Sequence, residues 1–251
     1  MLICGITTSP RDHGAFYLDD TVSSLKAAEA KLIHISAEPG CPVTDRGSLT
    51  AQDVEDVAWH PKRLGNWKNF CACAERVLFL ANETNETNEK FVVTCEDDVV
   101  FHPDALKIAH SELTRLQEEG EKVGFLALYT SSIYQRAIPE GTHYYRAKSL
   151  WGACALAWPV ESLRAVLDHP FAQKWRGMGP NPPSIGHPDI CHADTCIGET
   201  IIKLGLKSFM MKPSYCQHVG SVSSLRKVKL TPERQCSHFA GDDFCHGNTE
   251  K

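Results

Sequence analysis

The 251-residue sequence has little net charge, few aromatic residues and no apolar run long enough to cross a membrane as a helix. Its formal net charge is −5, so it lacks the broad basic field with which many proteins hold nucleic-acid backbones. The first ten residues contain an apolar stretch, but this stretch has neither the basic front nor the small-residue cleavage site of a secretion signal. We therefore expect a cytoplasmic protein with no membrane span.

The sequence also lacks a paired CxxC motif in its candidate zinc-binding groups, although it contains 11 cysteines. With no secretion signal recognised, we expect reduced thiols, and the odd count leaves at least one thiol unpaired in a monomer. Structural zinc remains an open alternative for two groups of residues: Cys191, His192 and Cys196, and Cys236, His238, Cys245 and His246.

Apolar segments alternate with amphipathic segments along most of the chain. Short apolar runs predict strands over 2–7, 31–36, 91–95, 123–129 and 149–158. Apolar residues at helical spacing predict helices over 18–28, 66–80, 103–119, 160–167 and 194–204. The stretches 41–64 and 174–191 are predicted to be irregular. This alternation predicts an α/β fold in which helices flank a mostly parallel sheet.

Three adjacent carboxylates, Glu96, Asp97 and Asp98, follow the strand predicted over 91–95. They therefore lie at the carboxyl end of a parallel strand, where open α/β folds bind ligands. Carboxylates packed so closely repel one another unless a cation or many hydrogen bonds compensate. Mg²⁺ and Mn²⁺ favour carboxylate oxygens and leave positions open for substrate phosphates. The triplet indicates a divalent metal site, and an acidic loop that caps the next helix or faces solvent is the alternative.

The acidic triplet resembles the DxD-type signature of GT-A glycosyltransferases. The segment 213–225, which contains Gln-His-Val-Gly followed by paired serines, is similar to the terminal motif of N-acetylglucosaminyltransferase-IV-like enzymes and their bacterial and viral relatives. The resemblance covers 2–225 and implies the GT-A fold, a Rossmann-like mixed, mostly parallel sheet flanked by helices. It also implies a catalytic domain over 1–225 and a C-terminal tail over 226–251.

The resemblance implies roles for particular residues. It implies that Asp98 and His218 hold Mn²⁺ or Mg²⁺ against the diphosphate of a nucleotide-sugar donor, with UDP as the nucleotide. A structural role is the alternative for His218, because a lone histidine is more often structural than a ligand. The donor-binding residues that the resemblance implies are Thr7, Thr8, Arg11, Gly65, Asn66, Asn69, Glu96, Asp97, Asp98, Trp151 and Gly152.

Several of these residues also have a purely structural interpretation. Thr7 and Thr8 are equally well explained as ordinary residues at the end of a strand. Gly65 lets the backbone approach a ligand closely, but the adjacent Asn66 is equally consistent with a helix N-cap. The ring of Trp151 can stack on a sugar, although a tryptophan more often packs in a core. Both interpretations remain open for each of these positions.

Sugar transfer with inversion requires a carboxylate that removes the proton of the acceptor hydroxyl. Asp194 is our candidate for this base, because it comes just before an amphipathic helix and after the glycine- and proline-rich loop, similar to where the family carries its catalytic acid. An aspartate is also a favoured N-cap, which is the structural alternative. Asp189 and Glu199 are rival candidates.

The acceptor is not identified by any motif. A glycan, a protein, a lipid-linked sugar and a modified DNA base are all compatible with the resemblance, in the cytoplasm of a bacterium or of a virus-infected cell. Two other functions also remain open. Carboxylates at a strand end hold metals in nucleotidyltransferases and phosphohydrolases too, and a sugar-nucleotide-binding module without activity would keep the same motifs.

Overall fold

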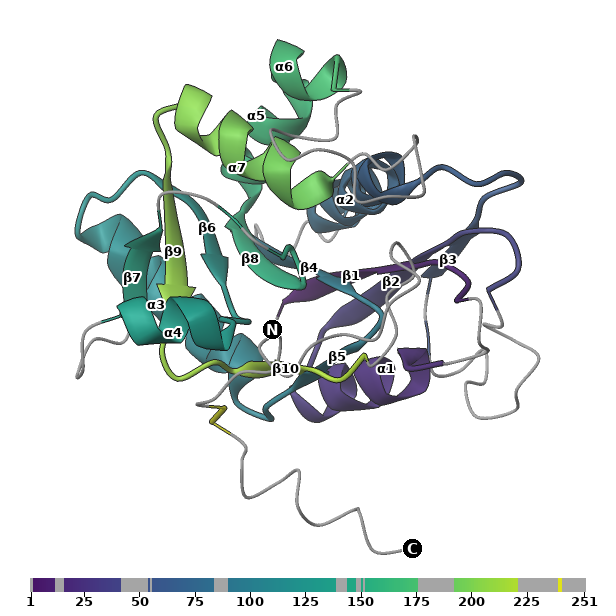
Figure 1. Cartoon of the computed structure of the whole chain (residues 1–251), viewed down its shortest axis with the longest axis horizontal. Helices are drawn as coiled ribbons and strands as arrows, with labels where there is room; N and C mark the ends of the chain where they lie inside the picture. The colour runs from purple at the N-terminus through teal and green to yellow at the C-terminus, as the bar shows by residue number, and fades with distance from the viewer. Residues whose placement is uncertain are drawn as a thin grey trace, which may run out of the picture.

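The computed structural model describes residues 2–11, 16–41, 54, 56–83, 90–138, 144–147, 150, 152–175, 192–220 and 239–240. Within these residues an eight-stranded sheet has the order β3-β2-β1-β4-β8-β6-β9-β7 (Figure 1). Its strands are β1 (Ile3–Thr8), β2 (Leu32–Ala37), β3 (Asp56–Trp59), β4 (Phe91–Glu96), β6 (Val123–Ala127), β7 (Tyr144–Ala147), β8 (Ala155–Pro159) and β9 (Lys207–Met211). The predicted α/β fold is confirmed.

The sheet is mixed and mostly parallel. The neighbouring strands β3, β2, β1 and β4 run parallel to one another. β8 is antiparallel to both of its neighbours, β4 and β6, whereas β9 is parallel to β6 and β7 is antiparallel to β9. A second, two-stranded antiparallel sheet pairs β5 (Val99–Phe101) with β10 (Cys216–His218). The small sheet brings the predicted terminal motif back beside the acidic triplet.

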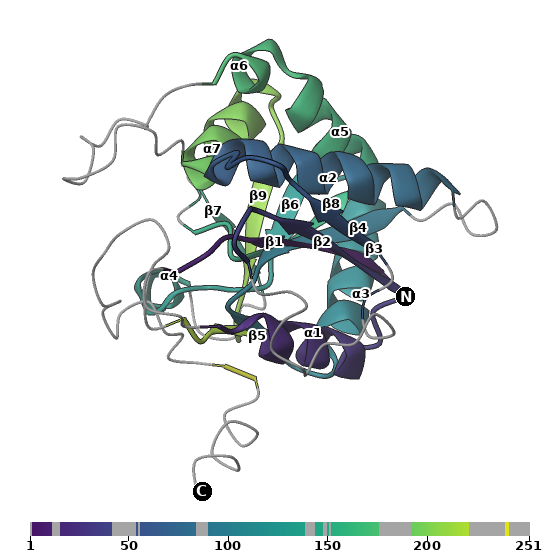
Figure 2. The same cartoon turned by 90° about the vertical axis from the view of Figure 1, so that its right-hand side faces the viewer.

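Helices cover both faces of the main sheet (Figure 2). One face is covered by α2 (Asn66–Glu83), α5 (Val160–Asp168), α6 (Pro170–Gln173) and α7 (Ala193–Lys203). The other is covered by α1 (Leu18–Ala27) and α3 (Ala105–Glu118), with the small sheet beside them. A short helix, α4 (Ser132–Ala137), follows β6. The helices predicted from apolar spacing are confirmed in place and order.

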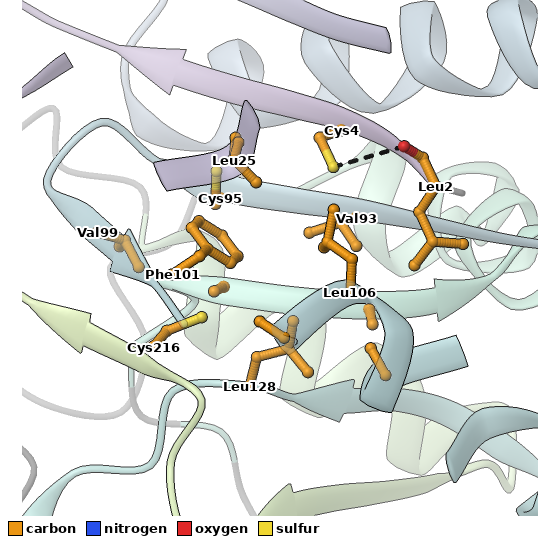
Figure 3. Close-up of a cluster of buried hydrophobic side chains, with 14 of the residues drawn as sticks. Leu2, Cys4, Leu25, Val93, Cys95, Val99, Phe101, Leu106, Leu128 and Cys216 are labelled. Carbon is orange, nitrogen blue, oxygen red and sulfur yellow. Dashed lines mark hydrogen bonds between the residues drawn. The ribbon is translucent and has the colours of Figure 1, made fainter. Parts of the chain in front are cut away.

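Alternation along β1 divides the interior into two apolar cores, because successive strand side chains point to opposite faces. Leu2 and Cys4 join the core on the side of α1 and α3, which also contains Leu25 and Leu106 (Figure 3). Ile3 joins the core on the side of α2. Both cores consist of side chains that are almost entirely removed from water.

Close packing of α2 on β1 depends on a glycine. A Cβ atom at Gly5 would lie 2.5 Å from Val77 and 2.6 Å from Cys73, both on α2. These distances are too short for real carbon contacts, so only glycine allows the helix to approach the strand this closely. This close approach fixes the distance between β1 and α2, and the end of β1 therefore lies near the start of α2.

Seven elements were not predicted from the sequence. β3 falls inside the predicted irregular stretch 41–64, and six others were not assigned: β5, β7, β9, β10, α4 and α6. The strand predicted over 149–158 is shorter, because β8 begins at Ala155 after Gly152, whose φ of +83° belongs to a turn. Phe239, which the predicted division places in the tail, is buried and bridges to Ser214. The division at residue 225 stays a prediction.

Two other expectations concern thiols and membranes. The cysteines within the described segments form no disulfide with one another; seven are buried and Cys71 is partly exposed. Across the parts of the chain that the structure describes, no helix combines the length and apolar character needed to cross a membrane.

Candidate functional site

The predicted site residues meet at one edge of the main sheet. β1 and β4 are parallel, so their carboxyl ends, with Thr8 and Glu96, lie at the same edge. β8 is antiparallel to β4, which brings the residues before its first position to that edge as well, and the backbone N–H of Glu96 donates to the carbonyl of Cys154 at 2.9 Å. In the small sheet, His218 pairs with Val99, directly after the triplet.

Hydrogen bonds hold the backbone of the triplet in place. The hydroxyl of Thr21, on α1, donates to the carbonyl of Asp97 at 2.9 Å and accepts from the N–H of Val99 at 3.2 Å. The N–H of Val219 donates to the carbonyl of Asp98 at 2.9 Å. The turn between β4 and β5 is therefore tied to α1 on one side and to β10 on the other.

Asp97 is buried and engaged by residues from the end of β1. Thr8 Oγ1 donates to Asp97 Oδ2 at 2.5 Å. The guanidinium of Arg11 makes two parallel bonds to Asp97, at 2.9 Å to Oδ2 and 2.7 Å to Oδ1. Such a bidentate pair fixes both geometry and charge. Asp97 thus fastens the loop after β1 to the end of β4.

Asp98 lies between Arg11 and His218. Its Oδ2 accepts from Arg11 at 2.8 Å and lies 3.3 Å from Nε2 of His218. Asp98 Oδ1 is buried and has no hydrogen-bond partner. The Arg11 guanidinium neutralises part of the charge of the crowded acids. The orphaned oxygen can accept a further hydrogen bond or contact a cation, because buried carboxylate oxygens normally have partners.

The three carboxylates of the triplet have different electrostatic environments. Burial and then the charge of Asp98 raise the pKa of Glu96 to about 7. Burial also raises the pKa of Asp97, although Arg11 opposes the rise. Burial acts in the same direction on Asp98, but the His218 and Arg11 interactions outweigh it and hold the pKa of Asp98 below its usual value. Asp98 is therefore the member of the triplet that keeps its charge most readily.

Glu96, Cys154 and His218 form a group of potential metal ligands. One carboxylate oxygen, one sulfur and one ring nitrogen, from these three residues, all lie within 4.8 Å of one another. His218 and Cys154 are buried, and Glu96 is half-buried. Sequence reasoning paired His218 with Asp98 but missed Cys154. Its proximity in sequence to Trp151 and Gly152, already expected to border the donor sugar, was the signal that pointed there.

Asp194 lies close to this group, at the start of α7. Its Oδ2 accepts from the N–H of Gly152 at 3.1 Å, and its Oδ1 accepts from the N–H of Thr195 at 2.8 Å. The N-cap of α7 is His192, so the alternative that Asp194 is the N-cap is wrong. The negative charge of Asp194 contributes to the raised pKa of Glu96. The charge of the candidate base thus acts on Glu96, and its carboxylate also holds the turn at Gly152.

The residues at the start of α2 make structural bonds. Asn66 accepts from the N–H of Ala193 at 2.8 Å, so it caps α7 rather than its own helix. Asn69 is buried, donates to the carbonyl of Thr8 at 3.2 Å and accepts from Ser36 at 2.8 Å. These bonds join α2 to the ends of β1 and β2 and to α7, which favours the structural interpretation of both asparagines.

Gly65 and Thr7 have similar ties. Gly65, with φ of +80°, donates its N–H to the buried carboxylate of Glu38 at 2.6 Å. Thr7 donates its hydroxyl to the carbonyl of Cys95 at 3.3 Å. Both residues therefore help to fasten the loops at this edge of the sheet.

Other predicted residues lie away from the site or outside the described segments. Glu199 is exposed on α7, whereas Asp189 and Trp151 fall outside the described residues. Of the two candidate zinc groups, His192 and Cys196 are described, and Cys196 is completely buried in the core on the α2 side of the sheet. The remaining members of both groups lie outside the described residues.

No protein-family model matches the sequence, and neither does any curated protein. Solved structures do match. S. aureus TarS gives a TM-score of 0.53 at 11% identity, over 88% of this chain and 37% of that one. A UTP-bound UGPase from Acinetobacter baumannii gives a TM-score of 0.49 at 7% identity, over 87% of this chain and 88% of that one. At such identities the likeness extends to the fold alone.

Proposed function

We propose that this chain is a metal-dependent glycosyltransferase that moves a sugar from a UDP-sugar donor onto an acceptor. The observation that carries the proposal is the meeting of Asp98, Glu96 and His218 at the carboxyl edge of the sheet, where Asp98 keeps one buried oxygen without a partner. Open α/β folds bind ligands at this edge. A buried acid cluster beside a histidine is the kind of site that a divalent cation completes.

Asp98 and His218 would hold Mn²⁺ or Mg²⁺. When bound, the ion neutralises the charge that develops on the departing diphosphate. The residues fit such an ion, because Asp98 lies beside His218 and its buried Oδ1 has no hydrogen-bond partner. Arg11 and Thr8 fix Asp97 beneath the site and so keep the neighbouring Asp98 in position.

Asp194 is the proposed base that accepts the proton of the attacking hydroxyl. The N–H groups of Gly152 and Thr195 donate to its two oxygens, which fixes the orientation of the carboxylate. A carboxylate with remaining lone pairs can accept a proton from a third direction. The proposed transfer inverts the anomeric centre, because a single base that activates the acceptor for direct attack leads to inversion.

The finer parts of the proposal concern relatives, acceptor and location. A relationship to N-acetylglucosaminyltransferase-IV-like enzymes is supported by the segment that contains His218 and Gly220, since Gly220 packs directly on the Asp98 carboxylate. The acceptor is a glycan, a protein, a lipid-linked sugar or a modified DNA base, and the proposed location is the cytoplasm of a bacterium or a virus-infected cell.

The test is metal-dependent turnover of UDP-sugars by the Asp98→Asn variant. Loss of the charge that binds the metal should lower UDP-sugar hydrolysis or transfer by about 100-fold or more. Asp104→Asn is the matched control, because this aspartate lies before α3 with a side chain that is 60% exposed. Unchanged turnover in Asp98→Asn would rule out the metal role, and turnover of nucleoside triphosphates in place of UDP-sugars would favour a nucleotidyltransferase or phosphohydrolase.

A further inference from the structure

Three different elements bring Glu96, Cys154 and His218 together. Glu96 ends β4, Cys154 directly precedes β8, and His218 ends β10. Their potential ligand atoms lie within 4.8 Å of one another. Around a single tetrahedral zinc-type ion, with bonds of about 2.0–2.3 Å, ligand atoms lie roughly 3.3–3.8 Å apart. Small side-chain movements therefore suffice for all three atoms to bind one ion.

We propose that Cys154 is a ligand of the metal ion at this site, together with Glu96 and His218, and that the site consequently prefers thiophilic ions such as Zn²⁺ and Co²⁺ over Mg²⁺. Sulfur ligands select zinc-like ions, whereas Mg²⁺ demands oxygen ligands. A site of carboxylate, thiolate and imidazole follows the order of affinities in which Zn²⁺ and Co²⁺ exceed Mn²⁺.

A second observation points to the same ion. Asp98 is 4% exposed, its Oδ2 lies 3.3 Å from Nε2 of His218, and its Oδ1 has no hydrogen-bond partner. A buried carboxylate oxygen without a partner is costly unless an unseen cation or water satisfies it. Asp98 therefore lies beside the group of three, in contact with His218, and carries a buried oxygen that a cation held there would satisfy.

The backbone fixes Cys154 in this position. The Glu96 N–H donates to the Cys154 carbonyl at 2.9 Å, so the two residues lie side by side on neighbouring strand ends. The preceding turn at Gly152 is held by its bond to Asp194. By contrast, Cys95 lies among apolar side chains in the core and burial raises the pKa of its thiol. Cys154 differs because its sulfur shares its surroundings with a carboxylate and an imidazole.

The inference rests on the proposed function in one respect, since the same ion would contact His218 and Asp98 and face the donor diphosphate. It adds Cys154 as a ligand that the sequence analysis did not suggest, and it changes the expected ion from Mn²⁺ or Mg²⁺ to a thiophilic ion. A thiolate ligand would leave the ion less positive than one bound by carboxylates and water alone. Replacing Cys154 should therefore alter which metal binds, not only how tightly.

The experiment is a Co²⁺ titration of the metal-free full chain, followed by absorption spectroscopy. A thiolate bound to Co²⁺ produces an intense near-ultraviolet charge-transfer band, and we expect this band to saturate at one equivalent. Cys154→Ser and Cys154→Ala should abolish it. Cys71→Ser is the matched control, because Cys71 lies on α2 and is partly exposed, and it should leave the band unchanged. Zn²⁺ should displace the band at stoichiometric amounts, whereas excess Mg²⁺ should not.

The remaining ligands are tested by affinity. Glu96→Gln keeps the thiol but removes a ligand charge, so it should weaken Co²⁺ binding about 10- to 100-fold while the band persists at saturation. A band that survives in both Cys154 variants would overturn the proposal, as would Co²⁺ binding to the unmodified chain without such a band. If the unmodified chain binds Co²⁺ without a charge-transfer band while UDP-sugar turnover still depends on Asp98, the proposed function stands and this inference fails. If the band depends on Cys154 but the chain does not turn over UDP-sugars, Cys154 is a metal ligand and the proposed function fails.

Discussion

Gly220 lies against the Asp98 carboxylate. A Cβ atom at this position would lie 2.2 Å from Asp98 Oδ2 and 2.9 Å from its Cγ. The backbone of Gly220 does not have the positive φ that favours glycine elsewhere in the chain. Steric exclusion, not backbone conformation, is therefore the reason for glycine here, and it packs the terminal motif directly against Asp98, a ligand of the proposed metal site.

Gly220→Ala is expected to move Asp98 away from His218. The added methyl group forces a shift in a buried contact, which should lower the free energy of unfolding by roughly 1–3 kcal/mol. It should also weaken divalent metal binding at least tenfold. Urea denaturation and calorimetric titration with Mn²⁺ measure the two effects.

Gly205→Ala provides the contrast at the residue scale. Gly205 has a φ of +68° and open space around its Cα, so alanine there strains the backbone without meeting another residue. It should cost about 1 kcal/mol and leave the metal affinity unchanged. If Gly220→Ala bound Mn²⁺ as tightly as the unmodified chain, close packing on Asp98 would have no role in holding the site.

Individual residues also show what the sequence can predict. The pairing of Asp98 with His218 was predicted from two motifs, because short motifs preserve both the residue types and their order. The contact of Arg11 with the donor stays a prediction, and the sequence did not predict that its guanidinium binds Asp97 and Asp98. That contact depends on how the loop after β1 folds over the end of β4, and sequence spacing carries no information on such a long-range approach.

At the scale of elements, the edge strand β3 is held by a partly buried network. His34 on β2 is completely buried, and its Nδ1 lies 3.0 Å from Oδ2 of Asp56 on β3. Arg76 on α2 donates to the same carboxylate at 2.7 Å and 3.1 Å. The bond with Arg76 is the main reason why the pKa of Asp56 is lowered. Burial lowers the pKa of His34, although the Asp56 carboxylate opposes the shift.

Asp56→Asn is expected to destabilise the chain in a pH-dependent way. The lowered pKa means that ionised Asp56 stabilises the folded state at pH values above its unfolded pKa of about 3.9, and that this contribution is lost as the pH falls through the folded value. The substitution should therefore cost about 1–2 kcal/mol at pH 7 and less below pH ~3.5. Urea denaturation at both pH values measures the difference.

Asp20→Asn serves as control for this substitution, because Asp20 is exposed on α1. It should change the free energy of unfolding by no more than about 0.5 kcal/mol. A cost for Asp56→Asn that stays the same at low pH would mean that the charge of Asp56 does not stabilise β3.

The same network explains why β3 was not predicted. Its four residues are too few for a periodic pattern, and only pairing with β2 and the contacts to α2 make them a strand. β5, with three residues, likewise depends on its partner β10. By contrast, α2 and β4 were predicted, because their apolar patterns are long or continuous enough to be recognised locally.

At the scale of the whole molecule, the site depends on segments that are far apart in the sequence. Thr8, Asp98, Cys154, Asp194 and His218 come from five different segments of the chain. The main sheet, the small sheet and α7 must all be folded for these residues to meet. A ligand that contacts several of them should therefore stabilise the entire chain and not one element, because it binds only the folded state.

UDP with Mn²⁺ should raise the free energy of unfolding by about 2.7 kcal/mol at a concentration 100 times its Kd. For a chain of this size that corresponds to a rise in Tm of roughly 5–10 °C. Thermal denaturation with UDP, with Mn²⁺ and with both, and with other nucleotides for comparison, measures the effect. We expect the largest shift with both ligands, because the ion joins the diphosphate to Asp98 and His218. No shift with UDP and Mn²⁺ would contradict the proposed donor and metal.

Asp194→Asn separates an enzyme from a module that only binds the donor. The amide keeps an oxygen that can accept from Gly152 but cannot take up the acceptor proton, so the thermal shift with UDP and Mn²⁺ should remain. Sugar transfer should fall by about 100- to 10,000-fold, as is typical when a general base is removed. Asp98→Asn should lose the shift as well as the transfer. Full transfer activity in Asp194→Asn would show that another group accepts the proton, whereas a lost shift would mean that Asp194 acts through the fold of the Gly152 turn.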